Sequence, residues 1–192
     1  MKKYLTAFSF CLLLAVTAFP AYAADDGALK NAIEGRYRDL KTAIANGNPN
    51  IYRENLASGF TSTDLAGKTR SADQIVDAIG RGVPDDSRKE KTTVNSLKQD
   101  GGKAVVEQTY DMKTIRAAAK GRRKINYHMV TKSTDTWIKD KDTWKLQKTV
   151  TNSGDVWIND KPVAHRVRGE AVEPAAGAAD KPADKKKPVP AK

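Results

Sequence analysis

The sequence contains a single cysteine, Cys11, which lies inside an apolar N-terminal segment. The chain from Ala24 onward has no thiol, which excludes disulfide bonds, a cysteine nucleophile and cysteine-ligated metals there. Histidine is almost as rare, because His128 and His165 are the only two and neither has the spaced partners of a histidine-rich metal site. Phosphate-binding glycine loops and the Gly-x-Ser-x-Gly pattern are also absent. We therefore expect no metal and no cofactor.

The N-terminus has the three parts of a secretory signal peptide. Lys2 and Lys3 precede an apolar run from Tyr4 to Phe19, which ends in the small-x-small sequence Ala21-Tyr22-Ala23. The run is short for a membrane span and Pro20 interrupts it. The sequence predicts a signal peptide at 1–23 that is cleaved after Ala23, no transmembrane segment after cleavage, and a secreted protein, in the periplasm.

The remainder divides into a domain at 24–169 and a tail at 170–192. The tail consists largely of Pro, Ala, Lys and Asp, so it cannot bury enough apolar surface to fold, and we expect it to be disordered. The net charge of the chain is +11, and the 27 basic and 19 acidic residues of 24–169 account for +8 of it. A basic secreted domain is attracted to envelope polyanions, although charges scattered along every element also serve solubility.

The densest basic cluster is Lys120-Gly121-Arg122-Arg123-Lys124. The residues Lys120, Arg122, Arg123 and Lys124 are candidates for binding a phosphate-bearing polyanion of the envelope. The cluster has no interleaved aromatic residues of the kind that stack on bases, so we expect no specific nucleic acid. A solvated loop is the alternative interpretation.

The first part of the domain has the pattern of helices. Apolar residues recur at spacings of three and four residues, which predicts one amphipathic helix: Leu29, Ile33, Tyr37, Leu40 and Ile44. Pro49 is well placed in the first turn of a short second helix. The capping box Ser71-x-x-Gln74 opens a third helix, which Gly80, Gly82 and Pro84 end.

The chain after Pro84 has the pattern of strands. Alternating segments lie at 91–97, 104–115 and 125–137, and shorter ones follow around Trp144 and Trp157, with turns at 100–102 and 139–142. An extended segment at 60–63 also has a partner strand at 69–70. Segregated helices followed by a meander predict an α+β domain, with three N-terminal helices packed on one face of a curved antiparallel sheet that forms a cone.

One hairpin pattern points to a family. Asp135-x-Trp137, a charged turn and Trp144-x-Leu146 follow the helical part. Over roughly Leu29 to Ser153 this order resembles the NTF2-like superfamily, in particular its SnoaL-like and ketosteroid-isomerase-like small domains. The resemblance implies the cone fold and a homodimer formed through the sheet. It leaves the function open, since such domains act as isomerases, dehydratases and cyclases or as plain binding and dimerisation modules.

Ketosteroid-isomerase-type chemistry needs a carboxylate base and hydrogen-bond donors in an apolar pocket. Asp135 is the candidate base, because its alternation places it with Trp137 on the face expected to be concave. Tyr37 and Tyr110 are candidate phenol donors. The alternative is a structural Asp135 bonded to a backbone amide, to Arg38 or to the Trp144 indole.

The residues predicted to line a ligand pocket share an inward position: Tyr37, Phe60, Tyr110, Tyr127, Met129, Asp135 and Trp137. The aromatic residues among them also suit an ordinary core. We predict a domain that binds a small apolar or amphipathic ligand, forms a homodimer, or does both. An isomerase or lyase with Asp135 as general base, and a polyanion binder acting through 120–124, are the alternatives.

Overall fold

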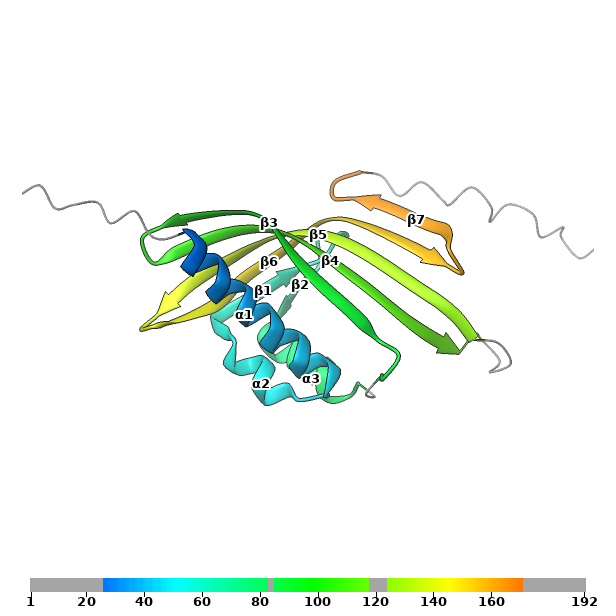
Figure 1. Ribbon diagram of the computed structural model, residues 1–192, viewed down its shortest axis with the longest axis horizontal. Coiled ribbons are helices and arrows are strands. Elements are labelled where there is room, and N and C mark those ends of the chain that lie inside the picture. The colour runs from blue at the N-terminus through cyan, green and yellow to red at the C-terminus, as the bar shows by residue number, and fades with distance from the viewer. Residues whose placement is uncertain (1–25, 83–84, 118–123, 171–192) are drawn as a thin grey trace, which may run out of the picture.

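The computed structural model describes residues 26–82, 85–117 and 124–170. The predicted signal peptide, almost all of the predicted tail and most of the basic cluster lie outside these residues. The elements run along the chain as follows (Figure 1): α1 (Asp26–Ala45), α2 (Pro49–Glu54), β1 (Leu56–Thr63), β2 (Thr69–Ser71), α3 (Ala72–Gly80), β3 (Lys89–Asp100), β4 (Lys103–Ala117), β5 (Lys124–Asp140), β6 (Thr143–Ile158) and β7 (Lys161–Val167).

The sheet has seven strands in the order β2-β1-β6-β5-β4-β3, with β7 also paired to β6. Strands β3 to β7 form the expected antiparallel meander. Strand β1 instead runs parallel to β6, with Thr61 opposite Lys148, so the prediction of a wholly antiparallel sheet was wrong. The reason is that β1 enters the sheet from α2 rather than from a hairpin turn, which leaves its direction free of the meander.

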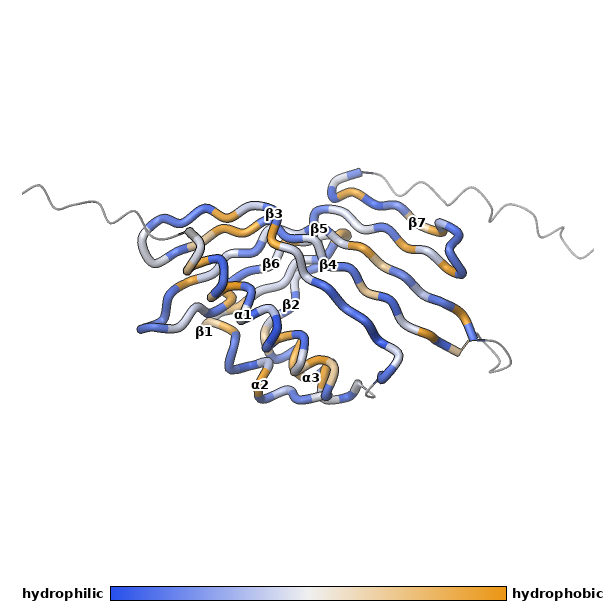
Figure 2. The backbone as a smooth tube through the Cα atoms, viewed as in Figure 1, coloured by the Kyte–Doolittle hydropathy of each residue, from blue (hydrophilic) through white to orange (hydrophobic). Residues whose placement is uncertain are grey.

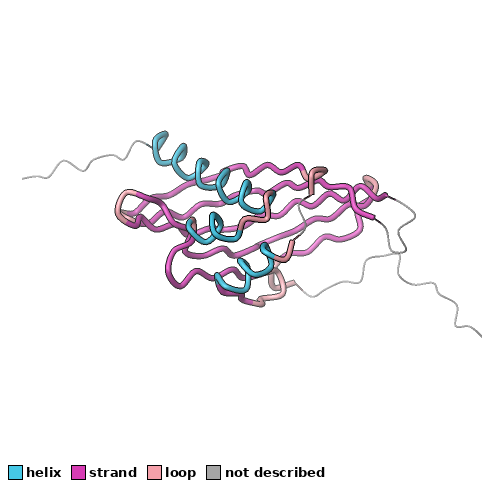
Figure 3. The backbone as a smooth tube through the Cα atoms, turned by 90° about the horizontal axis from the view of Figure 1, so that it is seen from below, coloured by secondary structure: helices cyan, strands magenta, loops and turns pink. Residues whose placement is uncertain are grey.

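Strands β1 and β7 share one edge of β6. Strand β1 pairs with its first half, from Leu146 to Val150, and β7 pairs with its second half, from Ser153 to Ile158. The long strands β4, β5 and β6 continue towards β7, past the part of the sheet that the helices cover (Figure 1). Seen from below, the three helices lie on one face of the sheet (Figure 3).

Local signals explain the helix boundaries. Asn48 accepts hydrogen bonds from the first turn of α2, and Pro49 occupies the position where a missing N–H is harmless. The predicted capping box is present at α3, where Ser71 and Gln74 bond reciprocally. None of the described helices has the length and apolar character needed to cross a membrane.

The core lies between α1 and the concave face of the sheet. Hydrophobic and hydrophilic residues alternate along the long strands (Figure 2), and the even-numbered residues of β4 and the odd-numbered residues of β5 face the helices. The buried cluster combines residues of the predicted α1 stripe, Val76 of α3 and residues of four strands: Leu29, Ile33, Tyr37, Leu40, Leu56, Phe60, Val76, Ala104, Val106, Trp137, Trp144 and Leu146. The α+β class is therefore confirmed.

Arg168, just after β7, ties the end of the domain to its beginning. Its Nε donates to the carbonyl of Thr151 at 2.8 Å, and its Nη2 donates to the carbonyls of Thr63 and Asp64 at 3.1 and 2.8 Å. Arg168→Ala should lower the free energy of unfolding by about 1–2 kcal/mol, because three half-buried carbonyls lose a charged donor. Urea unfolding monitored by circular dichroism measures this loss.

Arg166→Ala is the matched control, since Arg166 is exposed on β7. It should change the free energy of unfolding by less than about 0.5 kcal/mol. Equal losses in the two variants would show that Arg168 does not hold the β1–β2 turn.

Candidate functional site

Asp135 is the most unusual residue of the interior. It lies in the middle of β5 on the concave face and is only 2% exposed. The Tyr37 hydroxyl of α1 donates to its Oδ2 at 2.7 Å, and Nε1 of Trp137 donates to the Tyr37 oxygen at 3.3 Å. The Tyr37 and Trp137 rings meet edge to face, with centroids 5.1 Å apart. A chain of two hydrogen bonds thus ends on a buried carboxylate.

The second oxygen of this carboxylate, Oδ1, is buried and has no hydrogen-bond partner among the described residues. Thr149, its register partner on β6, is close enough to lower the pKa of the carboxyl but does not meet Oδ1 in hydrogen-bond geometry. In the described part of the chain no Lys, Arg or His forms an ion pair with Asp135. The partners considered from the sequence, Arg38 and the Trp144 indole, do not bond to it there.

Burial dominates the electrostatics of this group. Desolvation raises the pKa of Asp135 from its ordinary 3.8 to about 6, and the hydrogen bond from Tyr37 and the nearby Thr149 hydroxyl oppose the rise. Burial and the neighbouring carboxylate raise the pKa of Tyr37 far above its ordinary value. The same two causes raise the pKa of Tyr52, on α2, to about 12. We call Asp135, Tyr37, Tyr52 and Trp137 the Asp135 cluster.

Polar side chains continue from this cluster along the concave face. Ser133 on β5 is 4% exposed, and Gln108 opposite it on β4 is 8% exposed, with its Oε1 buried and unpartnered among the described residues. Thr131 and Met129, further along β5, are half-buried. The interior is therefore polar at its centre and becomes more accessible along β5 away from Asp135.

The other predicted lining residues fall in three places. Phe60 is part of the core beside the Asp135 cluster. Tyr127 and Met129 lie at the far end of the concave face, where the Tyr127 hydroxyl approaches the Met129 sulfur at 3.9 Å and the Arg116 guanidinium stacks over the Tyr127 ring at 4.2 Å. Tyr110 belongs to a separate network.

That network joins Tyr110 to two charged residues that sequence reasoning missed. The Tyr110 hydroxyl donates to Glu90 at 2.8 Å and accepts from Arg88 at 2.8 Å, while Arg88 and Glu90 form an ion pair. The Glu90 side chain is only 2% exposed. Burial raises the pKa of Tyr110, and the Glu90 charge adds to it while Arg88 opposes it. The only available signal was the weak alternation of β3, which places Glu90 on the same face as Val94.

Both histidines lie on the convex face. His128 pairs with Asp111 at 3.0 Å and stacks on Trp157 with centroids 4.7 Å apart. His165 pairs with Asp155 at 2.5 Å. Within the described ranges, no three His, Cys, Asp or Glu side chains come together as metal ligands.

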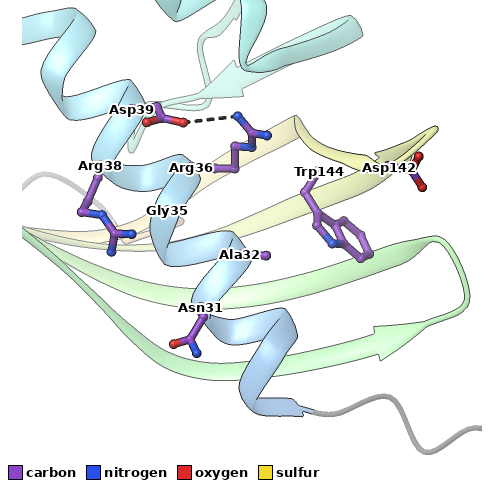
Figure 4. Close-up of a pocket in the computed structure, with 8 residues that line it drawn as sticks. All are labelled: Asn31, Ala32, Gly35, Arg36, Arg38, Asp39, Asp142 and Trp144. Atoms are coloured by element: carbon purple, nitrogen blue, oxygen red, sulfur yellow. Dashed lines mark hydrogen bonds and ion pairs between the residues drawn. The ribbon is translucent and has the colours of Figure 1, made fainter.

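A groove of about 290 Å³ lies between α1 and the β5–β6 hairpin (Figure 4). Its lining comes from α1 and the β5–β6 hairpin: Asn31, Ala32, Gly35, Arg36, Arg38, Asp39, Asp142 and Trp144. Arg36 is paired with Asp39 at 3.2 Å. The groove holds cations and anions in equal number and does not include Asp135.

The basic cluster is described only at its end. Lys124 is exposed at the start of β5, whereas Lys120, Arg122 and Arg123 lie outside the described residues. The polyanion site stays a prediction.

No protein-family model matches the sequence, and no curated protein matches it in sequence. The fold is nevertheless shared. A proposed scytalone dehydratase from Novosphingobium aromaticivorans is similar with a TM-score of 0.55 at 13% identity, covering 77% of this chain and 97% of that one. A protein of unknown function from Mycobacterium tuberculosis gives 0.54 at 14% identity, covering 68% and 75%. An NTF2-like protein of unknown function from Shewanella oneidensis gives 0.48 at 17% identity, covering 64% and 98%.

Such distant likenesses concern the fold alone. The chain has the NTF2-like fold, as the Asp135-x-Trp137 hairpin and the order of elements predicted. The activity of any neighbour is not thereby transferred to this chain.

Proposed function

We propose that this protein is a secreted, periplasmic ligand-binding domain, and that it binds a small apolar or amphipathic molecule between the helices and the concave face. The observation that carries the proposal is the buried Oδ1 of Asp135, which has no hydrogen-bond partner within residues 26–82, 85–117 and 124–170. A buried polar atom without a partner costs free energy, and in native proteins it usually marks a missing water or ligand. The predicted signal peptide supports a location outside the cytoplasm.

The surroundings of Asp135 support a ligand that is mostly apolar. Tyr37, Phe60 and Trp137 supply aromatic surface, while Ser133 and Gln108 supply polar groups beside the carboxylate. Binding sites for small molecules have this composition: apolar walls with a few placed polar atoms. We expect the ligand to donate a hydrogen bond to Oδ1 and to extend along β5 towards Met129.

Native mass spectrometry of the secreted protein, purified from its own host, tests the proposal. We expect a discrete additional mass that is lost on denaturation and is strongly reduced in Asp135→Asn. Asp111→Asn, on the convex face, is the control and should retain the mass. Equal retention by both variants would separate the ligand from Asp135 and contradict the proposed site.

A catalytic role for Asp135 as general base is the second candidate. The pKa of about 6 suits a base near neutral pH, and the carboxylate has no cationic partner in the described residues. Incubation of the identified ligand with the protein distinguishes the two functions. A changed ligand mass that requires Asp135 would identify an enzyme, and an unchanged mass would identify a binding protein.

We also propose a homodimer through the sheet. The convex face exposes Val105 and Ile115 on β4, with the His128–Trp157 stack on the strands beside it. Light scattering at several concentrations measures the state in solution. A monomeric mass at all concentrations, and the same mass for Ile115→Lys, would contradict the proposed dimer.

A further inference from the structure

Resting on the binding function proposed above, we infer that the ligand is an organic cation whose ammonium group pairs with Asp135. The group is a buried carboxylate whose Oδ2 accepts from Tyr37 and whose Oδ1 has no hydrogen-bond partner in the part of the chain that the structure describes. A carboxylate accepts hydrogen bonds and carries negative charge, so a charged N–H donor complements it best.

The distribution of charges supports this ligand chemistry. The chain has 34 Lys and Arg against 23 Asp and Glu. The described arginines that form ion pairs do so with Asp39, Asp64, Asp73 and Glu90. Asp111 and Asp155 are paired with histidine side chains. In a protein with surplus cations, the most buried acid of the described residues is thus left without one. Buried carboxylates are ordinarily paired, and a ligand that brings its own cation completes the pair.

The aromatic neighbours support the same conclusion. Tyr37 and Trp137 contact each other beside the carboxylate. Tyr52, on α2, is close enough for the charge of Asp135 to raise its pKa. Aromatic faces attract cations, and carboxylates combined with aromatic rings are a common way of recognising ammonium groups. Three rings from α1, α2 and β5 around one carboxylate fit an amine with an apolar body.

A neutral carbonyl ligand would need the opposite protonation state. It requires a protonated Asp135 as donor, whereas at pH 7.5 this carboxyl, with a pKa of about 6, is mostly ionised. The titratable groups facing Asp135 are Tyr37 and Tyr52, and both have raised pKa values, so neither ionises in this range. The remaining neighbours, Val106, Gln108 and Thr149, do not titrate. The ionisation of Asp135 therefore determines how the affinity for the amine depends on pH.

Calorimetric titration with three matched probes tests the inference: 2-(1-naphthyl)ethylamine, 1-acetylnaphthalene and 1-naphthylacetate. The three share an aromatic body and differ in their polar group. At pH 7.5 we expect the amine to bind at least about tenfold more tightly than either analogue, because only it forms the buried pair. At pH 5 that advantage should shrink, since Asp135 is then largely protonated.

Two variants locate the effect. Asp135→Asn should remove the preference for the amine, while Asp142→Asn, in the groove between α1 and the β5–β6 hairpin, should retain it. Tighter binding of the ketone or the carboxylate overturns the amine inference and leaves the binding function standing. Failure of all three probes at millimolar concentration overturns both. Loss of the preference in Asp142→Asn instead of Asp135→Asn would move the site to the groove and overturn the inference.

Discussion

Asp135→Asn is expected to raise the melting temperature at pH 7.5 and to change it little at pH 4. The folded-state pKa of Asp135, about 6, lies above its ordinary value of 3.8, so the folded protein holds this proton more tightly than the unfolded chain. The contribution of Asp135 to the free energy of unfolding is therefore most favourable below about pH 4 and falls as the pH rises through about 6. The difference between the two pKa values corresponds to about 3 kcal/mol of unfolding free energy lost at pH 7.5, and a neutral asparagine in this position avoids that loss. For a domain of this size the gain is about 5–10 °C.

The measurement is a pair of thermal unfolding curves at each pH for wild type and variant. The difference between them isolates Asp135 from groups whose pKa shifts the other way, such as Asp85, which accepts hydrogen bonds from Ser87 and Thr114 that lower its pKa. Asp111→Asn serves as control, because Asp111 is partly exposed and paired with His128. A lower melting temperature for Asp135→Asn at pH 7.5 would show that the carboxylate stabilises the fold.

The expected gain bears on why the carboxylate is there. Whole domains have stabilities of only about 5–15 kcal/mol, so a loss of about 3 kcal/mol from one side chain is large. A side chain that destabilises the fold is better explained by a functional role than by a structural one. Buried carboxyl groups with perturbed pKa values cluster at functional sites. This reasoning connects the stability experiment to the ligand experiments, which test the function directly.

Most of the fold was predictable because its signals are local. The stripe from Leu29 to Ile44 and the capping box at Ser71 specify helices through neighbouring residues alone. Alternation likewise placed Asp135 and Trp137 on one face of β5. The parallel pairing of β1 with β6 was not predictable in this way, since it joins Thr61 to Lys148 and depends on where α2 delivers the chain.

The partners of Asp135 show the same limit at the site. The sequence placed Tyr37 on the inward stripe of the first helix and Asp135 on the inward face of its strand. It did not say which helical residue crosses over the carboxylate, because that depends on how α1 lies across the sheet. Glu90 was missed for a related reason. The run Arg88-Lys89-Glu90-Lys91 has the composition of a solvated strand start, and only the folded chain brings Tyr110 over Glu90.

Tyr37→Phe is expected to destabilise the protein more at pH 7.5 than at pH 4. Within the described ranges Tyr37 is the one hydrogen-bond donor to Asp135 Oδ2, and the variant leaves the ionised carboxylate without it. Losing a donor to a buried charged group costs about 2–3 kcal/mol, whereas the protonated carboxyl at pH 4 depends on it less. The Trp137 indole also loses its acceptor, and this smaller cost is the same at both pH values. Urea unfolding at the two pH values measures the difference.

A double-mutant cycle then separates the two contributions. In an Asp135→Asn background, Tyr37→Phe should cost less at pH 7.5 than it does in wild type, because the partner no longer carries charge. Tyr127→Phe is the matched control, since the hydrogen-bond partner of its hydroxyl among the described residues is the uncharged Met129 sulfur, and its cost should not depend on pH. If Tyr37→Phe cost the same at both pH values and in both backgrounds, the Tyr37 hydroxyl would be serving the packing of α1, and Asp135 would be ionising without its help. A pH-dependent cost that disappears in the double variant would show that the Tyr37 hydroxyl stabilises the ionised form of Asp135 against the effect of burial.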